Sequence, residues 1–352
     1  SRMKEYIAFD SHKRYTLVEH EEVATGKVRQ YRIEHAPGAI RRALAGCEPG
    51  TAVAIEATAN WYWITDEIEQ ARCVPRLTHP RKAKLMMGLI DKTDQLDVHG
   101  MNRLQRNGTL PTVWIPPGPL RELRELTRTR VVLVAQRTRW KNRITATLAK
   151  WGLPASEYSD PYGKSARKEL EARIKPLPEQ TRWVVRQMLV ALDGLNVQIH
   201  EFEQRLDELV EVTPEMQWLE TLPGVGVILA ATIALEIGEI SRFATAERLA
   251  SYAGTTPRVH SSGDRTRYGR TRPDVNRYLK WAFAEAGNSV AVHYQNCPER
   301  HVSELYFRLR QRKGHNKAVG AVARHLAEAA FYVLSRQEAY RDPKADRVGP
   351  GV

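Results

Sequence analysis

Short apolar runs alternate with helical patterns over residues 4–108. Five runs have the length and composition of strands: 6–9, 14–18, 28–33, 52–55 and 74–77. Three stretches have the apolar spacing of helices: 39–45, 60–71 and 93–105. Strands that alternate with helices favour a mixed or parallel sheet. The pattern therefore predicts an N-terminal α/β domain.

The pattern changes after a cluster of turn-forming residues. Gly108-Thr109-Leu110-Pro111 and Ile115-Pro116-Pro117-Gly118-Pro119 interrupt regular structure. From residue 120 to about 210 the spacing is helical, with breaks near Gly152 and Pro178. We place the first domain at 1–112 and a helical region at 113–212.

One face of the second long helical stretch carries a heptad seam. Its members recur at steps of three and four: Val185, Met188, Leu192, Leu195, Ile199, Phe202, Leu206 and Leu209. This a/d spacing is typical of a coiled coil. Two packings satisfy it, a hairpin with the preceding helix or a coiled coil with a partner chain. Because the second packing joins copies of the chain, we expect a homo-oligomer, either a dimer or a tetramer.

The rest of the chain divides into a helical unit and a tail. Residues 213–336 are mostly helical in pattern, and we expect a further domain there. Residues 337–352 are charged and contain Pro and Gly. They are predicted to form a flexible tail.

Composition narrows the class of partner. Of 352 residues, 54 are Lys or Arg and 41 are Asp or Glu, so the formal net charge is +13. A folded protein this basic usually meets a polyanion, and nucleic acid is the first expectation. The longest apolar stretch, 225–235, is shorter than the ~20 residues of a membrane span. We therefore expect no membrane partner.

The cysteines point to a compartment. Cys47, Cys73 and Cys297 are widely spaced and form neither a disulfide framework nor a CxxC zinc motif. A reducing cytoplasm is the expected location.

Four carboxylates have the placement of a metal site. Asp10 and Glu56 each end a predicted strand, and Asp94 and Asp97 share one face of a predicted helix. Converging carboxylates repel unless a cation neutralises them, and oxygen ligands favour Mg²⁺ or Mn²⁺. Such ions activate phosphodiester chemistry. Asp91 competes at the same spacing, and a solvated helix face is the alternative for the helical pair.

The order of these motifs resembles the ribonuclease-H-like fold of RuvC-type nucleases. Residues 7–13 (IAFDSHK), 55–62 (IEATANWY) and 92–97 (KTDQLD) resemble the DEDD transposases of the insertion-sequence-110 family, relatives of the Piv invertases. Residues 222–226 (LPGVG), 253–263 (AGTTPRVHSSG) and 276–282 (NRYLKWA) resemble its C-terminal motifs. The likeness spans nearly the whole chain, although the central helices match only in character.

This resemblance implies a bacterial, nucleoid-associated recombinase with a two-part active site. Its metal-binding and catalytic acidic tetrad carries over as Asp10, Glu56, Asp94 and Asp97, and its nucleophile as Ser262. In the family the serine forms a phosphoserine link to DNA, and the two parts meet across subunits. A structured noncoding (bridge) RNA guides the reaction by pairing with donor and target DNA.

This sequence departs from the family pattern in two places. Asn60 and Trp61 stand where the family commonly has Gly and then Thr or Ser. Ser261 directly precedes Ser262, so the identity of the nucleophile stays open between them.

Basic residues surround the serine motif. They are Arg258, His260, Arg265, Arg267, Arg270 and Arg272. Guanidinium groups bind phosphate through two hydrogen bonds and stabilise a charged transition state. Because the segment around the serine motif has several Gly and Ser and few apolar residues, we predict that it forms a mobile loop. A loop that only grips backbone phosphates is the alternative.

A second group of basic residues lies along the first long helix. Its members are Arg121, Arg124, Arg128, Arg130, Arg137, Arg139, Lys141 and Arg143. We expect Arg137 and Lys141 to bind nucleic acid, since each neutralised phosphate adds salt-sensitive affinity.

Three functions remain open. The first is an RNA-guided recombinase that uses both the tetrad and Ser262. The second is a RuvC-like metal-dependent junction nuclease that needs the tetrad but no covalent serine step. The third is a non-catalytic, basic nucleic-acid scaffold.

Overall fold

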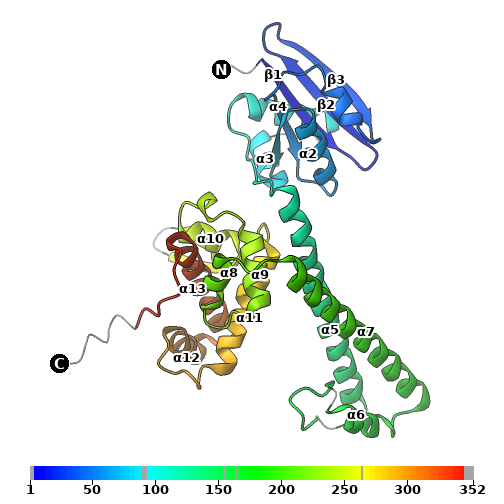
Figure 1. The fold of residues 1–352 in the computed structure, drawn as a ribbon, viewed down its shortest axis with the longest axis vertical. Helices are drawn as coiled ribbons and strands as arrows, with labels where there is room; N and C mark the ends of the chain where they lie inside the picture. Colours follow the sequence, from blue (N-terminus) through cyan, green and yellow to red (C-terminus); the bar gives the residue numbers. More distant parts are fainter. Residues whose placement is uncertain (1–3, 89–92, 154–155, 164, 263–264, 345–352) are drawn as a thin grey trace, which may run out of the picture. The chain divides into compact units, whose positions relative to one another are not determined.

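The fold is given by a computed structural model that describes residues 4–88, 93–153, 156–163, 165–262 and 265–344 (Figure 1). For 259–262, 265–268 and 270, it describes the backbone only. The chain forms two compact units, Ser1–Ile115 and Pro116–Val352. The further predicted division of the second unit at residue 212 stays a prediction.

A five-stranded mixed sheet forms the centre of the first unit. Its strands are β1 (Glu5–Ser11), β2 (Tyr15–Glu22), β3 (Lys27–Glu34), β4 (Ala52–Glu56) and β5 (Val74–Thr78). They lie in the order β3-β2-β1-β4-β5. The first three pair antiparallel, whereas β4 and β5 run parallel to β1. This arrangement confirms the mixed sheet and is consistent with a ribonuclease-H-like domain.

Helices cover both faces of this sheet. They are α1 (Ala39–Ala43), α2 (Trp61–Gln70), α3 (Pro80–Met87) and α4 (Asp94–Arg106). Because successive side chains of a strand point to opposite faces, Ile7 and Phe9 pack with the α1 and α2 side. Ala8 packs on the other face with residues of α3 and α4. Its small side chain leaves room for α4 to lie close to the sheet. The short α3 is absent from the sequence prediction.

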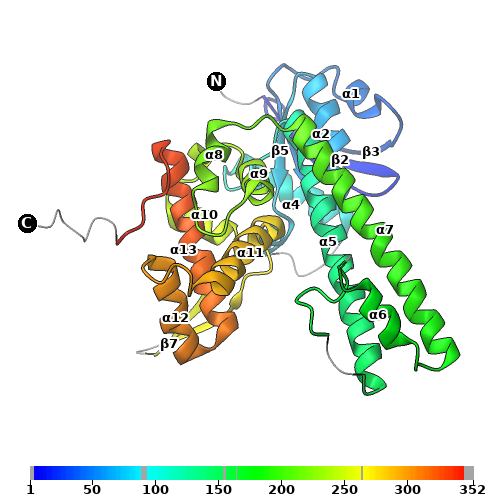
Figure 2. The same ribbon diagram turned by 60° about the horizontal axis from the view of Figure 1, so that its bottom comes forward.

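A long helical hairpin begins the second unit. Its elements are α5 (Gly118–Lys150), α6 (Arg167–Ile174) and α7 (Glu179–Leu209). Helices α5 and α7 run side by side, and α6 packs near their far end (Figure 2). The seam residues Val185, Leu192 and Ile199 are buried. The seam therefore packs within the chain, as the first of the two predicted packings requires, and the oligomeric state stays a prediction.

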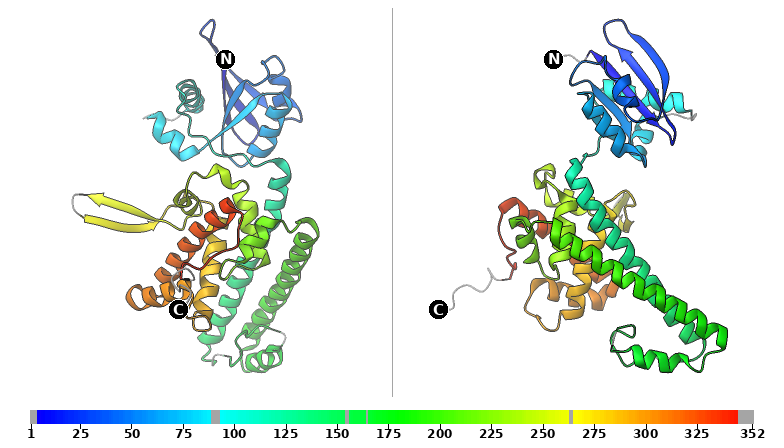
Figure 3. Two further views of the ribbon diagram at one scale, coloured as in Figure 1. Left: turned by 60° about the vertical axis from the view of Figure 1, so that its left-hand side comes forward. Right: turned by 45° about the vertical axis from the view of Figure 1, so that its right-hand side comes forward.

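Short and medium helices make up the rest of the second unit. They are α8 (Pro214–Glu220), α9 (Val227–Ile237), α10 (Ala246–Tyr252), α11 (Arg277–His293), α12 (His301–Lys313) and α13 (His315–Arg336), with the 3-10 helix η1 (Ile240–Arg242). They share one apolar core, and α13 contacts α8, α10, α11 and α12. Strands β6 (Pro257–Ser262) and β7 (Arg265–Thr271) form a hairpin that projects from these helices (Figure 3).

The first part of the predicted flexible tail is anchored. The backbone N–H of Tyr340 donates to Thr221 Oγ1 at 2.7 Å, and Asp342 accepts from the His301 N–H at 3.0 Å. Residues 345–352 lie outside the described residues. Within the described ranges, none of the helices is both long and apolar enough to span a bilayer.

Candidate functional site

Two of the predicted acidic residues come from adjacent parallel strands. Residues Ile7 to Phe9 of β1 pair in register with Val53 to Ile55 of β4. Asp10 and Glu56 follow at the carboxyl ends of these strands, where sites of α/β sheets gather. Strand alternation puts both on the face of Ala8, which α4 covers.

The other two acidic residues stand in the first turn of α4. Thr93 caps this helix, because its Oγ1 accepts the Leu96 N–H at 3.2 Å. The free N–H groups of a first turn stabilise nearby negative charge, which suits Asp94 and Asp97. The competing Asp91 lies outside the described residues.

His12 joins the acidic residues directly. Its Nε2 lies 3.3 Å from Asp10 Oδ2 and 3.2 Å from Asp94 Oδ2. One ligand atom from each of these three residues falls within 4.8 Å of the others. The Asn60 side chain donates to the His12 carbonyl at 2.9 Å and ties the loop after β1 to the loop after β4. Asn60, which stands where the family commonly has Gly, thus helps to position the site.

The prediction from sequence missed His12 as a site residue. A signal was present, because His12 follows Asp10 by two residues and strand alternation places such residues on one side. The histidine lies just beyond the end of β1, so the alternation alone did not single it out.

The electrostatics of this cluster favour a cation. Asp10 is only 7% exposed, and burial raises the pKa of its carboxyl group. His12 opposes the rise in this pKa, while the carboxylates of Asp94 and Asp97 add to it. Carboxylate oxygens with an imidazole nitrogen form a donor set that could bind a divalent metal. Glu56 ends the neighbouring strand and Asp97 lies in the first turn of α4. Among the described residues, the group with ligand atoms within 4.8 Å contains Asp10 and Asp94 of the predicted tetrad but neither Glu56 nor Asp97.

The serine motif forms a β-hairpin, which corrects the predicted mobile loop. Ser262 ends β6, and its backbone pairs with Arg265 of β7. Only Gly263 and Asp264 separate them in sequence, and Gly-Asp between two strand-like runs is a hairpin signal that the prediction overlooked. Several predicted site side chains lie outside the described ones: His260, Ser261, Ser262, Arg265, Arg267 and Arg270.

Both ends of the hairpin are anchored to helices. Lys280 Nζ of α11 donates to Thr271 Oγ1 at 2.6 Å, and Thr255 Oγ1 donates to the Ala250 carbonyl at 3.0 Å. Asn276 caps α11 by accepting the N–H groups of Tyr278 and Leu279, each at 3.0 Å. The strands thus project from a fixed base.

A buried carboxylate holds this base. Glu236 of α9 is fully buried and accepts Arg128 Nε at 2.6 Å and Arg128 Nη2 at 2.9 Å. Its Oε2 also accepts Asn276 Nδ2 at 2.7 Å. One carboxylate therefore links the long helix α5 to the residue that caps α11.

Part of the basic tract on α5 has a structural role. Arg124 is buried and donates to the carbonyls of Leu235 at 2.7 Å and Glu236 at 2.9 Å. Burial lowers the pKa of Arg124, and the Glu236 carboxylate opposes that shift. Arg124 caps the last turn of α9, whose carbonyls lack partners within the helix.

Three of the residues that we predicted to contact nucleic acid bind neighbouring side chains of the same chain. Lys141 Nζ lies 3.0 Å from Asp160 Oδ1, and Arg137 Nη1 lies 3.5 Å from Asn196 Oδ1. Arg272 pairs with Asp274 through two bonds, the shorter at 2.9 Å. Arg258 is half-buried.

Sequence comparisons place both units among transposases. Residues 216–302 match a family profile described as "Transposase IS116/IS110/IS902 family", and residues 27–151 match the profile "Transposase" of the IS110 DEDD type. A "Probable family 20 transposase" of Pseudomonas aeruginosa is 25% identical over 83% of this chain and 86% of its own length. The "Transposase for insertion sequence element IS1111A" of Coxiella burnetii is 23% identical over 71% and 69%.

Proposed function

Because the chain belongs to the IS116/IS110/IS902 family of transposases, we propose that it cuts and rejoins the DNA of an insertion sequence. The observation that carries the proposal is the convergence of Asp10, His12 and Asp94, with ligand atoms within 4.8 Å, at the carboxyl edge of the sheet. The net charge of +13 suits a protein that holds nucleic acid.

The acidic edge is the proposed metal centre. Asp10, Glu56, Asp94 and Asp97 would hold Mg²⁺ or Mn²⁺, and the ion would supply Lewis-acid activation of a DNA phosphate. The buried Asp10 favours binding, because a cation stabilises its ionised form. His12 Nε2 lies between Asp10 and Asp94, where it would offer a nitrogen ligand to the ion beside the carboxylate oxygens.

Ser262 is the proposed nucleophile. Its Oγ would form an ester with a DNA phosphorus as one phosphodiester bond breaks, and the departing deoxyribose oxygen would leave as a free hydroxyl. Attack by a hydroxyl of a second DNA end would reverse the reaction, rejoin DNA and release the serine. The resemblance of residues 253–263 to the family's serine motif supports this role, and the neighbouring arginines suit phosphate binding.

We extend the proposal to the partners that the resemblance implies. A structured noncoding RNA would pair with donor and target DNA and so select the sites, and a dimer or tetramer would hold the strands together. The charge excess supports nucleic-acid binding in general.

One experiment tests the reaction. The full chain is incubated with Mg²⁺, the noncoding RNA of its element, and donor and target DNA. Joined product and a denaturant-resistant protein–DNA adduct are then measured. Ser262→Ala should abolish both, Asp10→Asn should abolish both, and the matched control Ser261→Ala should retain them. An adduct formed by Ser262→Ala would refute the assigned nucleophile.

The second candidate is a metal-dependent RuvC-like nuclease without a serine step. The DEDD type of the matching profile favours it. It predicts cleavage without an adduct, lost in Asp10→Asn and unchanged in Ser262→Ala. A non-catalytic scaffold would instead tolerate both substitutions.

A further inference from the structure

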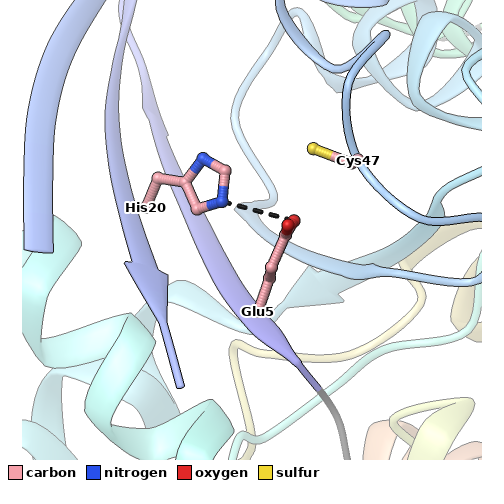
Figure 4. Close-up of side chains that lie close together, drawn as sticks. All are labelled: Glu5, His20 and Cys47. Atoms are coloured by element: carbon pink, nitrogen blue, oxygen red, sulfur yellow. Dashed lines mark ion pairs between the residues drawn. The ribbon is translucent and has the colours of Figure 1, made fainter. Parts of the chain in front are cut away.

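A second cluster of metal-ligating side chains lies in the first unit, away from the acidic edge. Glu5 starts β1, His20 belongs to β2, and Cys47 lies between α1 and β4. The three side chains point into one space (Figure 4). One ligand atom from each lies within 4.8 Å of the others, and His20 Nε2 is 3.3 Å from Glu5 Oε2.

Strand geometry explains why these residues meet. His20 pairs with Ile7, so Glu5 is its diagonal neighbour two residues along β1. Both point to the face that α1 and α2 cover, where Cys47 packs. Glu5 precedes Asp10 by five residues, which is about 17 Å along a strand. The two clusters are therefore separate sites.

Two further observations show that the cluster suits a cation. The Glu5 Oε2 atom is buried without a hydrogen bond. Cys73 adds a second thiol, which packs against the same core as Cys47. The half-buried Cys47 thiol thus lies beside the Glu5 carboxylate and the His20 imidazole, three groups of which each offers a ligand atom to one ion.

We propose that Glu5, His20 and Cys47 bind one structural Zn²⁺ ion, with Cys73 as the fourth ligand. Zinc takes thiolate, imidazole and carboxylate ligands in tetrahedral sites. Bond lengths of about 2.0–2.3 Å place tetrahedral ligand atoms about 3.3–3.8 Å apart. His20 Nε2 and Glu5 Oε2, at 3.3 Å, already have this spacing, and Cys47 Sγ lies within 4.8 Å of both. The Cys73 thiol would have to move toward them as the ion binds. The thiolates distinguish the site from the oxygen-rich acidic edge, which favours Mg²⁺.

The ion would stabilise the part of the sheet where β1 begins. It would join β1, β2 and the two connections that carry Cys47 and Cys73, and so stabilise the first unit independently of the reaction. The proposal concerns metal content and stability, so it stands or falls separately from the proposed function.

Metal analysis of the full chain tests the site. The protein is loaded with Zn²⁺, dialysed against buffer without metal, and its zinc measured by atomic emission. One zinc per chain is expected, lost in Cys47→Ser and retained in Cys297→Ser and Asp10→Asn. Zinc loss should also lower the thermal midpoint of the first unit.

A second measurement needs no variant. Co²⁺ bound to the unsubstituted protein should give a thiolate-to-cobalt charge-transfer band, which an oxygen-only site lacks. Absence of both retained zinc and this band would overturn the proposal. So would full zinc retention in Cys47→Ser, or a disulfide between Cys47 and Cys73 in the purified protein.

Discussion

Replacing Glu236 by glutamine removes a buried charge while it keeps the shape of the side chain. The wild-type carboxylate accepts two bonds from Arg128 and one from Asn276, and it lies 3.8 Å from Arg124 Nε. Glu236→Gln leaves these guanidinium groups without their counter-charge. We expect the helices around α9 and α11 to lose stability.

The burial of this ion pair determines how much stability is lost. Breaking a buried ion pair from one side costs about 3–5 kcal/mol. The Arg128 side chain is 24% exposed and glutamine retains one oxygen acceptor, so the lower end applies. A loss of about 3 kcal/mol corresponds to a ~10²-fold rise in the population of locally open molecules.

Hydrogen exchange of the full chain measures this loss by residue. It suits a protein of two compact units, for which a single unfolding transition is not defined. The matched control is Glu208→Gln, whose partner Arg205 forms an exposed pair on α7. The control should change stability by less than about 1 kcal/mol. Equal protection of α9 and α11 amides in Glu236→Gln and in the control would refute the stabilising role of the network.

Three further predictions concern a tight turn and the acidic edge. Gly224→Ala should destabilise the second unit by more than about 1 kcal/mol, because φ is +78° and a Cβ would lie 2.4 Å from the Ala286 carbonyl oxygen. Gly226→Ala, with open space around it, is the control, and equal thermal midpoints would contradict the argument. Asp10→Asn should raise the thermal midpoint of the metal-free first unit at pH 7. Because the pKa of Asp10 is raised in the folded protein, the carboxyl group stabilises the fold below its ordinary pKa, and this contribution is lost as the pH rises through the folded value. A lower thermal midpoint for Asp10→Asn than for the unsubstituted protein, both in chelator, would contradict this reasoning. His12→Gln should raise the Mg²⁺ concentration needed for half-maximal DNA cleavage ~10–100-fold, and an unchanged requirement would show that His12 does not support the metal centre.

Local patterns were sufficient to predict most of the secondary structure. The strands from β1 to β5 and the helices α4, α5 and α7 follow from period-two and period-3.6 spacing of apolar residues, which neighbouring residues alone determine. Strand ends and a helix start also placed Asp10, Glu56 and Asp94 near one edge, because parallel strands share their carboxyl edge. The β6–β7 hairpin was missed because its strands carry polar residues on both faces and lack an apolar period.

The sequence by itself thus determined the α/β unit, the long helices, the acidic edge and the basic charge. Only the tertiary structure decided which basic residues are exposed, since Arg128 and Glu236 are 108 residues apart. The spacing of charges along α5 is the same whether a face meets water or the end of α9. Likewise His20 and Cys47 come together only when β2 pairs with β1 and the segment after α1 packs on the face of the sheet to which His20 points. Contacts between distant segments depend on the packing of whole elements, and no local pattern records them.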